Sequence, residues 1–251
     1  MRKISVSDRV TAILKSVGLN LEGISMPGLI HETGIVKPTL HRLVGQLRQA
    51  NYVAENSDGL IIPGAKFVQV AISSTQANLR RVQRESILTG MSKELGETCG
   101  ISIPRDNHMV YYDRVEANWP LQVHIPLNVK TPFWATASGK LYLSTLSKSA
   151  RLSLIGGMKF EKFAKNTITD YEQLEQEIKS IKQQGYSLDN EELIDGMVAI
   201  AVPILDKKGK YLASLFCHCP MIRKNIDELL HALPVIKRYS AELEVMLENL
   251  A

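Results

Sequence analysis

The sequence predicts an α+β fold, and two observations support that class. The first quarter of the chain holds three short segments whose apolar residues recur at helical spacing, followed by two short runs of strand-forming residues. The rest alternates strand-like and helix-like segments, with turn residues between two pairs of strands. With 251 residues, of which 45% are hydrophobic and 22% charged, the chain has enough apolar material for one or two packed domains.

The first two helices are marked by their ends. Apolar residues at positions 6, 10, 13, 14 and 17 form one helical stripe, Ser5 and Asp8 have the spacing of a capping box, and Gly18 is expected to end the helix. The second helix is predicted to begin after Ser25 as N-cap and to end at Gly34, in the left-handed conformation that glycine favours.

A third helix over residues 37–49 starts at Pro38, which is tolerated in a first helical turn. One face is apolar, with Leu40, Leu43, Val44 and Leu47, and the other carries Lys37, His41, Arg42, Gln46, Arg48 and Gln49. Strand-like runs follow at residues 52–55 and 60–62, around the hairpin-turn pair Asp58-Gly59. Three helices, a short turn between the last two, and a hairpin together predict a winged helix-turn-helix.

The polar face of the third helix is suited to a DNA major groove. Arginine can bond a guanine edge through two hydrogen bonds, glutamine can do the same with adenine, and Lys, Thr and His can hold phosphates or bases. Residues 1–70 also hold eight basic and five acidic residues, a balance of +3, whereas the other 181 residues hold 22 and 21, a balance of +1. The alternative is a solvated amphipathic helix in a small bundle, and the turn, the hairpin and the charge together favour DNA binding.

The cysteines and the N-terminus indicate the compartment. Cys99, Cys217 and Cys219 are too few, and odd in number, for the disulfide framework of a secreted domain, which predicts a reducing, cytoplasmic setting. No signal peptide or membrane contact is expected, because polar residues follow Met1 and the longest apolar run, residues 197–205, is far shorter than the ~20 residues of a membrane-spanning helix. No cofactor is predicted.

Beyond the hairpin, a connecting helix is predicted over residues 64–77 and a further helix around Leu88, Met91 and Leu95. A domain boundary is expected near residues 75–79, which gives domains over 1–75 and 76–251. In the second domain, strands are expected over 98–103, 109–115, 121–125, 196–205 and 211–219. Helices are expected from Thr136, over 171–185, and from Asn225 to the C-terminus with a kink at Pro234.

Several segments, in order along the whole chain, resemble one known family. They are Val36–Leu43, Leu60–Gly64, Val110–Glu116, Ala135–Lys140, Thr167–Thr169, Gly185–Glu192 and the strand pair through Pro220. By these segments the chain resembles the IclR-type bacterial transcriptional regulators, named for the isocitrate lyase regulator. The resemblance implies a winged helix-turn-helix, a linker helix, and a C-terminal effector-binding and oligomerisation domain built on an antiparallel sheet with flanking helices.

The resemblance also implies partners. Such regulators, repressors among them, typically form a homodimer through the N-terminal region and assemble further into a dimer of dimers, a homotetramer. A small effector, often a carboxylate or an aromatic acid, modulates their binding to double-stranded operator DNA. Carried over to this sequence, the DNA contacts would come from Ser25, Lys37, Thr39, His41 and Arg42. Pro38 departs from the family, which often has Ser there, so Thr39 is expected to take the phosphate-binding role.

An effector pocket is expected where residues 132–136 lead into a helix. The N–H groups of Ala137, Ser138 and Gly139 would form a helix N-terminus suited to a carboxylate. The family's effector contacts match Ala137 and Ser138 at this helix start. They also match Val123, Asp189, Met197, Ala199, Phe216 and His218. For the apolar members Val123, Met197 and Ala199, plain core packing is the alternative.

Phe216 and His218 stand where familiar members of the family carry small hydroxyl residues. Because they lie two residues apart on one strand, both side chains point to the same face. One hypothesis is that Phe216 stacks on an effector, while His218, protonated beside Asp189, pairs with its carboxylate. The alternative is that the two side chains fill the cavity and leave an effector-insensitive regulator.

Three other functions compete with this interpretation. Cys217-His218-Cys219 could suggest a metal site, but on a strand the two sulfurs face away from the imidazole, so no metal is predicted. A hydrolase using Ser138, His218 and Asp189 is the enzymatic alternative, although the Gly-x-Ser-x-Gly elbow is missing. A protein-interaction module without DNA binding is the third. The expectation is a regulator and not an enzyme.

Overall fold

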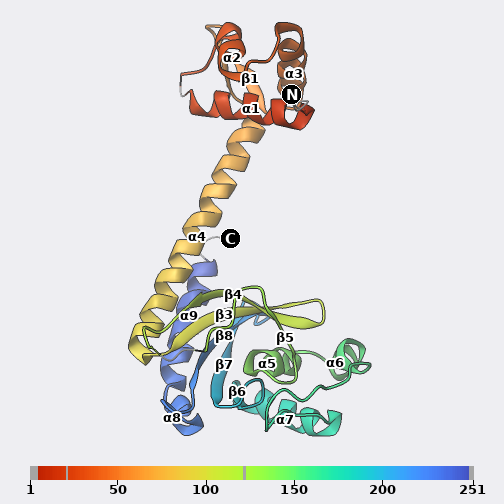
Figure 1. Cartoon of the computed structure of the whole chain (residues 1–251), viewed down its shortest axis with the longest axis vertical. Coiled ribbons are helices and arrows are strands. Elements are labelled where there is room, and N and C mark those ends of the chain that lie inside the picture. Colours follow the sequence, from red (N-terminus) through yellow and green to blue (C-terminus); the bar gives the residue numbers. More distant parts are fainter. Residues whose placement is uncertain (1–4, 21, 121–122, 249–251) are drawn as a thin grey trace. The chain divides into compact units, whose positions relative to one another are not determined.

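The computed structural model describes residues 5–20, 22–120 and 123–248, and the chain divides into two compact units, Met1–Arg80 and Arg81–Ala251 (Figure 1). The division falls inside one continuous helix, α4 (Ala65–Leu95). The prediction of two separate helices in this stretch is wrong, because no proline interrupts residues 65–95 and a single helix propagates through them. The functional boundary near residue 75 stays a prediction.

The first unit confirms the predicted winged helix-turn-helix. Ser5 and Asp8 form the capping box of the first helix, and the Ser25 side chain caps the second. Gly34 and Gly59 adopt the expected left-handed conformation, with φ of 65° and 76°. The elements are α1 (Val6–Leu19), α2 (Met26–Thr33), α3 (Lys37–Gln49), and the antiparallel hairpin of β1 (Val53–Glu55) and β2 (Ile61–Pro63).

Gly18 does not end α1 as predicted, since the helix continues to Leu19. A Cβ atom at Gly18 would lie 3.1 Å from the ring of Phe67 on α4, so the glycine instead permits the close approach of these two helices. The core of this unit buries the apolar faces of α1, α2 and α3, with the predicted Leu40, Leu43, Val44 and Leu47 of α3 among its members.

The second unit is built on a six-stranded antiparallel sheet with the strand order β5-β4-β3-β8-β7-β6. Its strands are β3 (Thr98–Arg105), β4 (His108–Val115), β5 (Lys130–Thr131), β6 (Ser187–Asn190), β7 (Met197–Leu205) and β8 (Tyr211–Pro220). The predicted pairs β3–β4 and β7–β8 are confirmed, and β3 joins them by pairing with β8. Among the described residues, no helix is both long and apolar enough to cross a membrane.

Helices cover the two faces of this sheet (Figure 1). One face packs against the end of α4, α8 (Ile226–His231) and α9 (Leu233–Glu248), in a core that includes Leu88, Cys99 and Cys217. The other face, here called the inner face, lies under α5 (Ala137–Thr145) and α7 (Tyr171–Gln184). Thr136 caps α5, and Gly185 ends α7 with φ of 76°, both as predicted.

The strand predicted over residues 121–125 is wrong for 123–125, which form no strand, while 121 and 122 lie outside the described residues. The edge of the sheet is instead β5, which pairs with β4. Val123 and Ile125 still alternate with polar residues, because both pack against the apolar cluster of the inner face. The alternation of apolar residues therefore reflects burial here and does not indicate a paired strand.

Three elements differ from the prediction, two short ones that were not predicted and one helix that is broken in two. The sequence did not predict α6 (Lys148–Ile155) or β6, which has only four residues and acquires strand geometry by pairing with β7. The final helix is two helices, α8 and α9, separated at Ala232. Pro234 lies in the first turn of α9, where its missing N–H is tolerated, so a break replaces the predicted kink.

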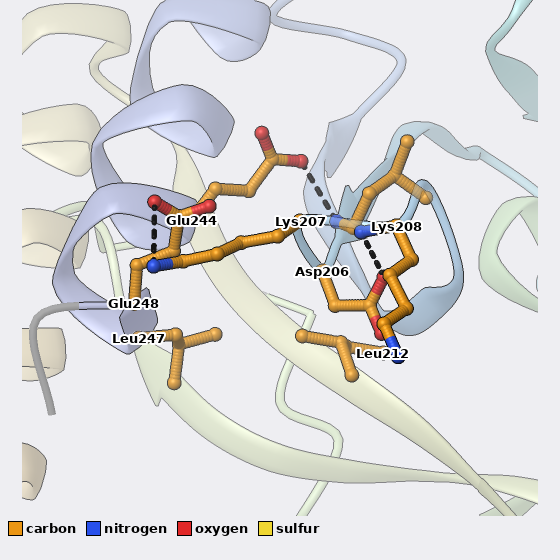
Figure 2. Close-up of a pocket in the computed structure, with 8 residues that line it drawn as sticks. Asp206, Lys207, Lys208, Leu212, Glu244, Leu247 and Glu248 are labelled. Atoms are coloured by element: carbon orange, nitrogen blue, oxygen red, sulfur yellow. Dashed lines mark hydrogen bonds and ion pairs between the residues drawn. The ribbon is translucent and has the colours of Figure 1, made fainter. Parts of the chain in front are cut away.

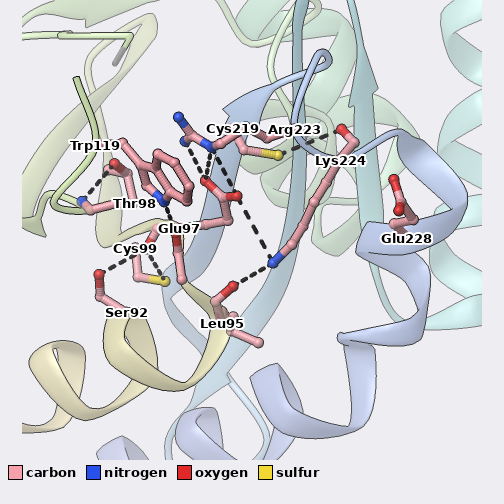
Figure 3. Close-up of polar contacts among 12 residues, drawn as sticks. Ser92, Leu95, Glu97, Thr98, Cys99, Trp119, Cys219, Arg223, Lys224 and Glu228 are labelled. Carbon is pink, nitrogen blue, oxygen red and sulfur yellow. Dashed lines mark hydrogen bonds and ion pairs between the residues drawn. The ribbon is translucent and has the colours of Figure 1, made fainter. Parts of the chain in front are cut away.

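A buried carboxylate ties the end of α4 to the sheet (Figure 3). Glu97 is 2% exposed and accepts hydrogen bonds from Arg223 Nε at 3.1 and 3.2 Å. Lys224 Nζ lies 3.9 Å from the same carboxylate, and the Trp119 indole donates to the Gly96 carbonyl at 3.2 Å. These contacts hold the start of β3 between α4 and the segment that follows β8.

Candidate functional site

The polar face of α3 is exposed, as DNA contact requires. The side chains of Lys37, His41 and Arg42 are all solvent-exposed, whereas Thr39 is half-buried. Arg42 Nη1 donates to Gln46 Oε1 at 3.2 Å, one helical turn further along. This contact orders both side chains on the surface that would meet base edges.

Two nearby polar side chains, Ser25 and Arg48, also make contacts that stabilise the first unit. Ser25 Oγ accepts from the Gly28 N–H at 3.2 Å, so its oxygen caps α2 while its proton remains available for a phosphate. Arg48, at the end of α3, pairs with Glu55 of β1 at 2.5 Å. That ion pair joins α3 to the hairpin, so the Arg48 guanidinium is less available for a DNA contact.

The strand register brings most of the predicted effector residues together on the inner face. Asp189, Ala199 and His218 occupy directly paired positions on β6, β7 and β8. Phe216 lies in the next inward-facing row, paired with Ala201 and with Gly100. Paired residues of adjacent strands share a face, so these side chains form one surface.

An apolar cluster occupies the middle of this surface. Its members include Ala137, Met197, Ala199 and Phe216, with Val123 packed against them. The Phe216 ring lies 4.8 Å from Tyr111 and meets the His218 ring edge-on at 5.7 Å between centroids.

Gly100 is required beneath the Phe216 ring. A Cβ atom at this position would lie 2.6 Å from the ring, closer than real side-chain contacts allow. The glycine on β3 therefore makes the space into which Phe216 turns. This residue was not predicted, since only the pairing of β3 with β8 reveals its role.

Polar atoms without partners surround the cluster. Both ring nitrogens of His218 are buried and have no hydrogen-bond partner among the described residues, and the same holds for Arg114 Nη1 and for the hydroxyls of Ser102 and Ser187. All four residues point to the inner face by their register. A buried polar group left unpaired costs about 1–3 kcal/mol, so this concentration marks a place where a ligand or water supplies the partners.

His218 is uncharged, contrary to the hypothesis of a protonated ring. Burial, followed by the positive charges of Arg114 and Arg223, lowers the pKa of His218 to about 4, against a smaller opposite effect of Glu116. Asp189 is absent from the charges that act on the ring. A neutral imidazole can both donate and accept a hydrogen bond.

Asp189 belongs to a buried polar network. Burial and the nearby Glu192 raise the pKa of Asp189 to about 7. Its Oδ1 atom accepts from the Glu192 N–H at 2.8 Å, and the Glu192 carboxylate accepts from Lys140 Nζ at 2.5 and 2.7 Å. Lys140 is 1% exposed. This ion pair was not predicted, although both residues lie in segments that carried the family resemblance.

The start of α5 offers two N–H groups, one fewer than predicted. Thr136 Oγ1 accepts from the Gly139 N–H at 3.0 Å, so Gly139 is already engaged. The N–H groups of Ala137 and Ser138 belong to the first helical turn, where no partner exists within a helix. The Ser138 carbonyl accepts from Ser214 Oγ at 3.4 Å, which fixes the helix end over β8.

The geometry counts against both chemical alternatives. A catalytic triad needs hydrogen bonds from the histidine to Ser138 and Asp189, and neither ring nitrogen of His218 has a described partner. Cys217 and Cys219 lie in the core on the opposite face of the sheet from His218, so the three side chains cannot share one metal ion.

Comparison with known proteins gives one consistent family. The family model described as bacterial transcriptional regulator IclR C-terminal matches residues 72–243. The chain is 28% identical over 221 residues to the probable transcriptional regulator SauR of Cupriavidus necator, covering 88% of each protein. It is 23% identical over 209 residues to the transcriptional repressor IclR of Escherichia coli, covering 82% of this chain and 76% of that protein.

A solved structure shows the same fold. It is an IclR homologue of Microbacterium hydrocarbonoxydans complexed with 4-hydroxybenzoate, at 17% identity and a TM-score of 0.62. The likeness covers 98% of this chain and 100% of that one.

The buried ion pair generates a stability prediction. We expect Lys140→Met to lower the free energy of unfolding by about 3–5 kcal/mol, because it leaves the Glu192 carboxylate buried without its partner. Urea unfolding measures the change. The double variant Lys140→Met, Glu192→Leu should recover most of the loss, and a double variant as unstable as the single one would contradict the assignment.

Asp189 generates a pH prediction. Its folded pKa of about 7 lies above the ordinary aspartate value of 3.8, so folding favours the protonated carboxyl. This contribution is fully present below about pH 4 and is lost as the pH rises through 7. Asp189→Asn keeps the Oδ1 acceptor and removes the charge, so its stability relative to wild type should rise between pH 5 and pH 8. Urea unfolding at pH 5 and pH 8 measures the free energy of unfolding of both proteins. The same change between the two pH values in both proteins would count against this prediction.

Proposed function

This chain belongs to the IclR family of bacterial transcriptional regulators, and we propose that it represses transcription by binding operator DNA through α3 and releasing it in response to a small organic acid. It is a regulator and not an enzyme, as are the curated proteins that it resembles. The repressor assignment is supported by the relative from Escherichia coli, which is named a transcriptional repressor. Residues 1–75 form the DNA-binding domain and residues 76–251 the effector-binding domain. The protein acts in the cytoplasm, where operator DNA lies.

The exposed face of α3 supports the DNA proposal. Lys37, His41 and Arg42 project from a helix whose opposite face is buried in the unit's core. We assign base contacts to Arg42, and phosphate or base contacts to Lys37 and His41. Thr39 and Ser25 are half-buried, and we assign them to phosphate contacts.

An unpartnered stripe on α4 supports a homodimer. Val68, Ile72, Leu79 and Val82 are between 43% and 57% exposed. With Thr75 between them, they follow the alternating four- and three-residue spacing of a coiled-coil seam. A second copy of α4 is the natural occupant, and a further pairing of such dimers would give the tetramer.

The inner face supports the effector proposal, and the unpaired nitrogens of His218 carry it. A carboxylate can accept from the N–H groups of Ala137 and Ser138 at the positive end of α5. Phe216 supplies an aromatic wall, and His218 and Arg114 Nη1 supply hydrogen bonds to a polar substituent. The solved homologue that binds 4-hydroxybenzoate is consistent with an aromatic acid as effector.

Substitution of Arg42 tests the DNA proposal. We expect Arg42→Ala to weaken binding to the chain's own upstream DNA by about 10- to 100-fold, since a good bidentate base contact is worth about 1–3 kcal/mol. Fluorescence anisotropy at fixed salt measures the change. Arg48→Ala is the matched control on the same helix, because Arg48 is engaged with Glu55. Equal losses in both variants, or none in Arg42→Ala, would refute the assignment.

Substitutions on the inner face test the effector proposal. Titration calorimetry with acetate, benzoate and 4-hydroxybenzoate should show an acid that binds and that also releases operator DNA. Phe216→Ser and His218→Ser should each weaken its binding by roughly tenfold, the cost of one lost contact of about 1.4 kcal/mol. Unchanged affinity in both variants would overturn the contacts. No heat from any acid would instead favour the filled, effector-insensitive pocket.

A further inference from the structure

A second hollow lies at the β5 edge of the sheet in the second unit. It has a volume of about 470 Å³ and forms where the start of β4, the segment around β5 and the segment after α6 meet. Its lining residues are Asn107, His108, Lys130, Thr131, Pro132, Trp134, Met158, Lys159, Glu161 and Phe163. None of them belongs to the predicted effector contacts of the inner face.

The hollow contains a buried histidine with an unused nitrogen. His108 is 7% exposed, and its Nδ1 atom lies 3.1 Å from Asn107 Oδ1. Because the Asn107 oxygen can only accept, Nδ1 carries the proton and Nε2 keeps its lone pair. Nε2 is buried and has no hydrogen-bond partner among the described residues. The group that this nitrogen lacks is a hydrogen-bond donor.

The charges around His108 favour an anion. Two lysines and one glutamate line the hollow, namely Lys130, Lys159 and Glu161. Lys130 is near enough to His108 to lower the pKa of its ring, after the larger effect of burial. A ligand that bears a carboxylate for the lysines and a hydroxyl for Nε2 would complement both features.

The remaining lining is aromatic and held in place. Trp134 stacks on Phe160 at 5.1 Å between centroids with 26° between the planes, and Phe163 lies 6.1 Å away. The Trp134 indole donates to the Glu161 carbonyl at 3.2 Å, which fixes the ring. Phe163 is 45% exposed. A planar ring against these side chains would bury apolar surface with little loss of side-chain freedom.

Another hollow of the second unit, between α9 and the β7–β8 hairpin, lacks this chemistry (Figure 2). Its polar groups are already engaged with one another. Glu244 Oε1 accepts from the Leu205 N–H at 2.7 Å, Asp206 Oδ1 accepts from the Lys208 N–H at 2.8 Å, and Lys207 lies 3.7 Å from Glu248. Among its described lining residues, no buried side-chain polar atom lacks a hydrogen-bond partner.

We propose that the hollow at the β5 edge is a second small-molecule site, which takes a planar aromatic carboxylate carrying a hydroxyl group. The carboxylate lies between Lys130 and Lys159, the ring packs on Trp134 and Phe163, and the hydroxyl donates to His108 Nε2. This site is distinct from the inner-face effector site and does not rest on the regulatory function. A hydroxybenzoate is the simplest molecule with these groups.

Two methionines allow the two sites to be followed separately. Met158 lines the hollow, and Met197 lies in the cluster of the inner face. In the full chain with ¹³C-labelled methionine methyl groups, assigned by Met158→Leu and Met197→Leu, 3-hydroxybenzoate, 4-hydroxybenzoate and benzoate are titrated. We expect a saturable shift of the Met158 signal, with its own affinity, and at least one hydroxybenzoate that binds there roughly fivefold or more tightly than benzoate.

Variants of the hollow make the test specific. His108→Phe should abolish the advantage of the hydroxybenzoate over benzoate, because Nε2 is then missing. Lys130→Met, at an exposed position that is safe for folding, should weaken both acids by roughly fivefold or more. Phe216→Ser, on the inner face, is the matched control and should leave the Met158 titration unchanged.

Three results would overturn the proposal. One is a shift of Met197 alone. Another is a Met158 shift that follows the Met197 affinity in every variant, since that would be an indirect effect of the effector site. The last is competition by inorganic phosphate as strong as that of the hydroxybenzoates, which would show a site for any anion without selection for the ring.

Discussion

The alternation of side chains along β7 and β8 is the constraint on which the second unit depends. Each strand places one residue in the core under α4, α8 and α9 and the next on the inner face. Cys217 therefore packs in the helical core, while its neighbours Phe216 and His218 face α5. A slip of one residue would exchange these sets, burying the imidazole among the aliphatic side chains of the core and exposing a thiol to the ligand surface. The predicted effector residues come together because this register is fixed, and Gly100 on β3 completes it by leaving room for the Phe216 ring.

Buried polar groups normally find partners within the protein, and several on the inner face have none among the described residues. Lys140 and Glu192 satisfy one another, and Glu97 is satisfied by Arg223. Among the residues that the structure describes, His218 and Arg114 Nη1 have no such partner. The neutral state of His218 is part of the same design, because burial near two arginines makes protonation costly. A neutral ring can discriminate between ligands by hydrogen bonding, but it does not attract anions by charge.

The sequence was informative where local chemistry decides the structure. The capping box at Ser5, the glycine ends of α2 and α7, and the turn pair Asp58-Gly59 each depend on a few adjacent residues, and each is confirmed. It was misleading where pairing or burial decides. β6 is a strand because β7 lies beside it, residues 123–125 are not one although their apolar residues alternate, and the pKa of His218 is lowered because the fold buries its ring and brings Arg114 and Arg223 near it. The DNA-contact and effector residues follow from family resemblance, and neither composition nor spacing would have selected Ala199 or Asp189 alone.

Within one chain the backbone connects the two units only once, inside α4. No proline interrupts this helix between the two units. Arg84 of α4 donates to Asp113 at 2.5 Å, and Leu88 and Met91 lie in the sheet core. Asp113 is the immediate neighbour of Arg114, whose side chain is on the opposite, inner face. A ligand that engaged Arg114 would therefore contact β4 directly beside Asp113, the residue that binds Arg84 of α4.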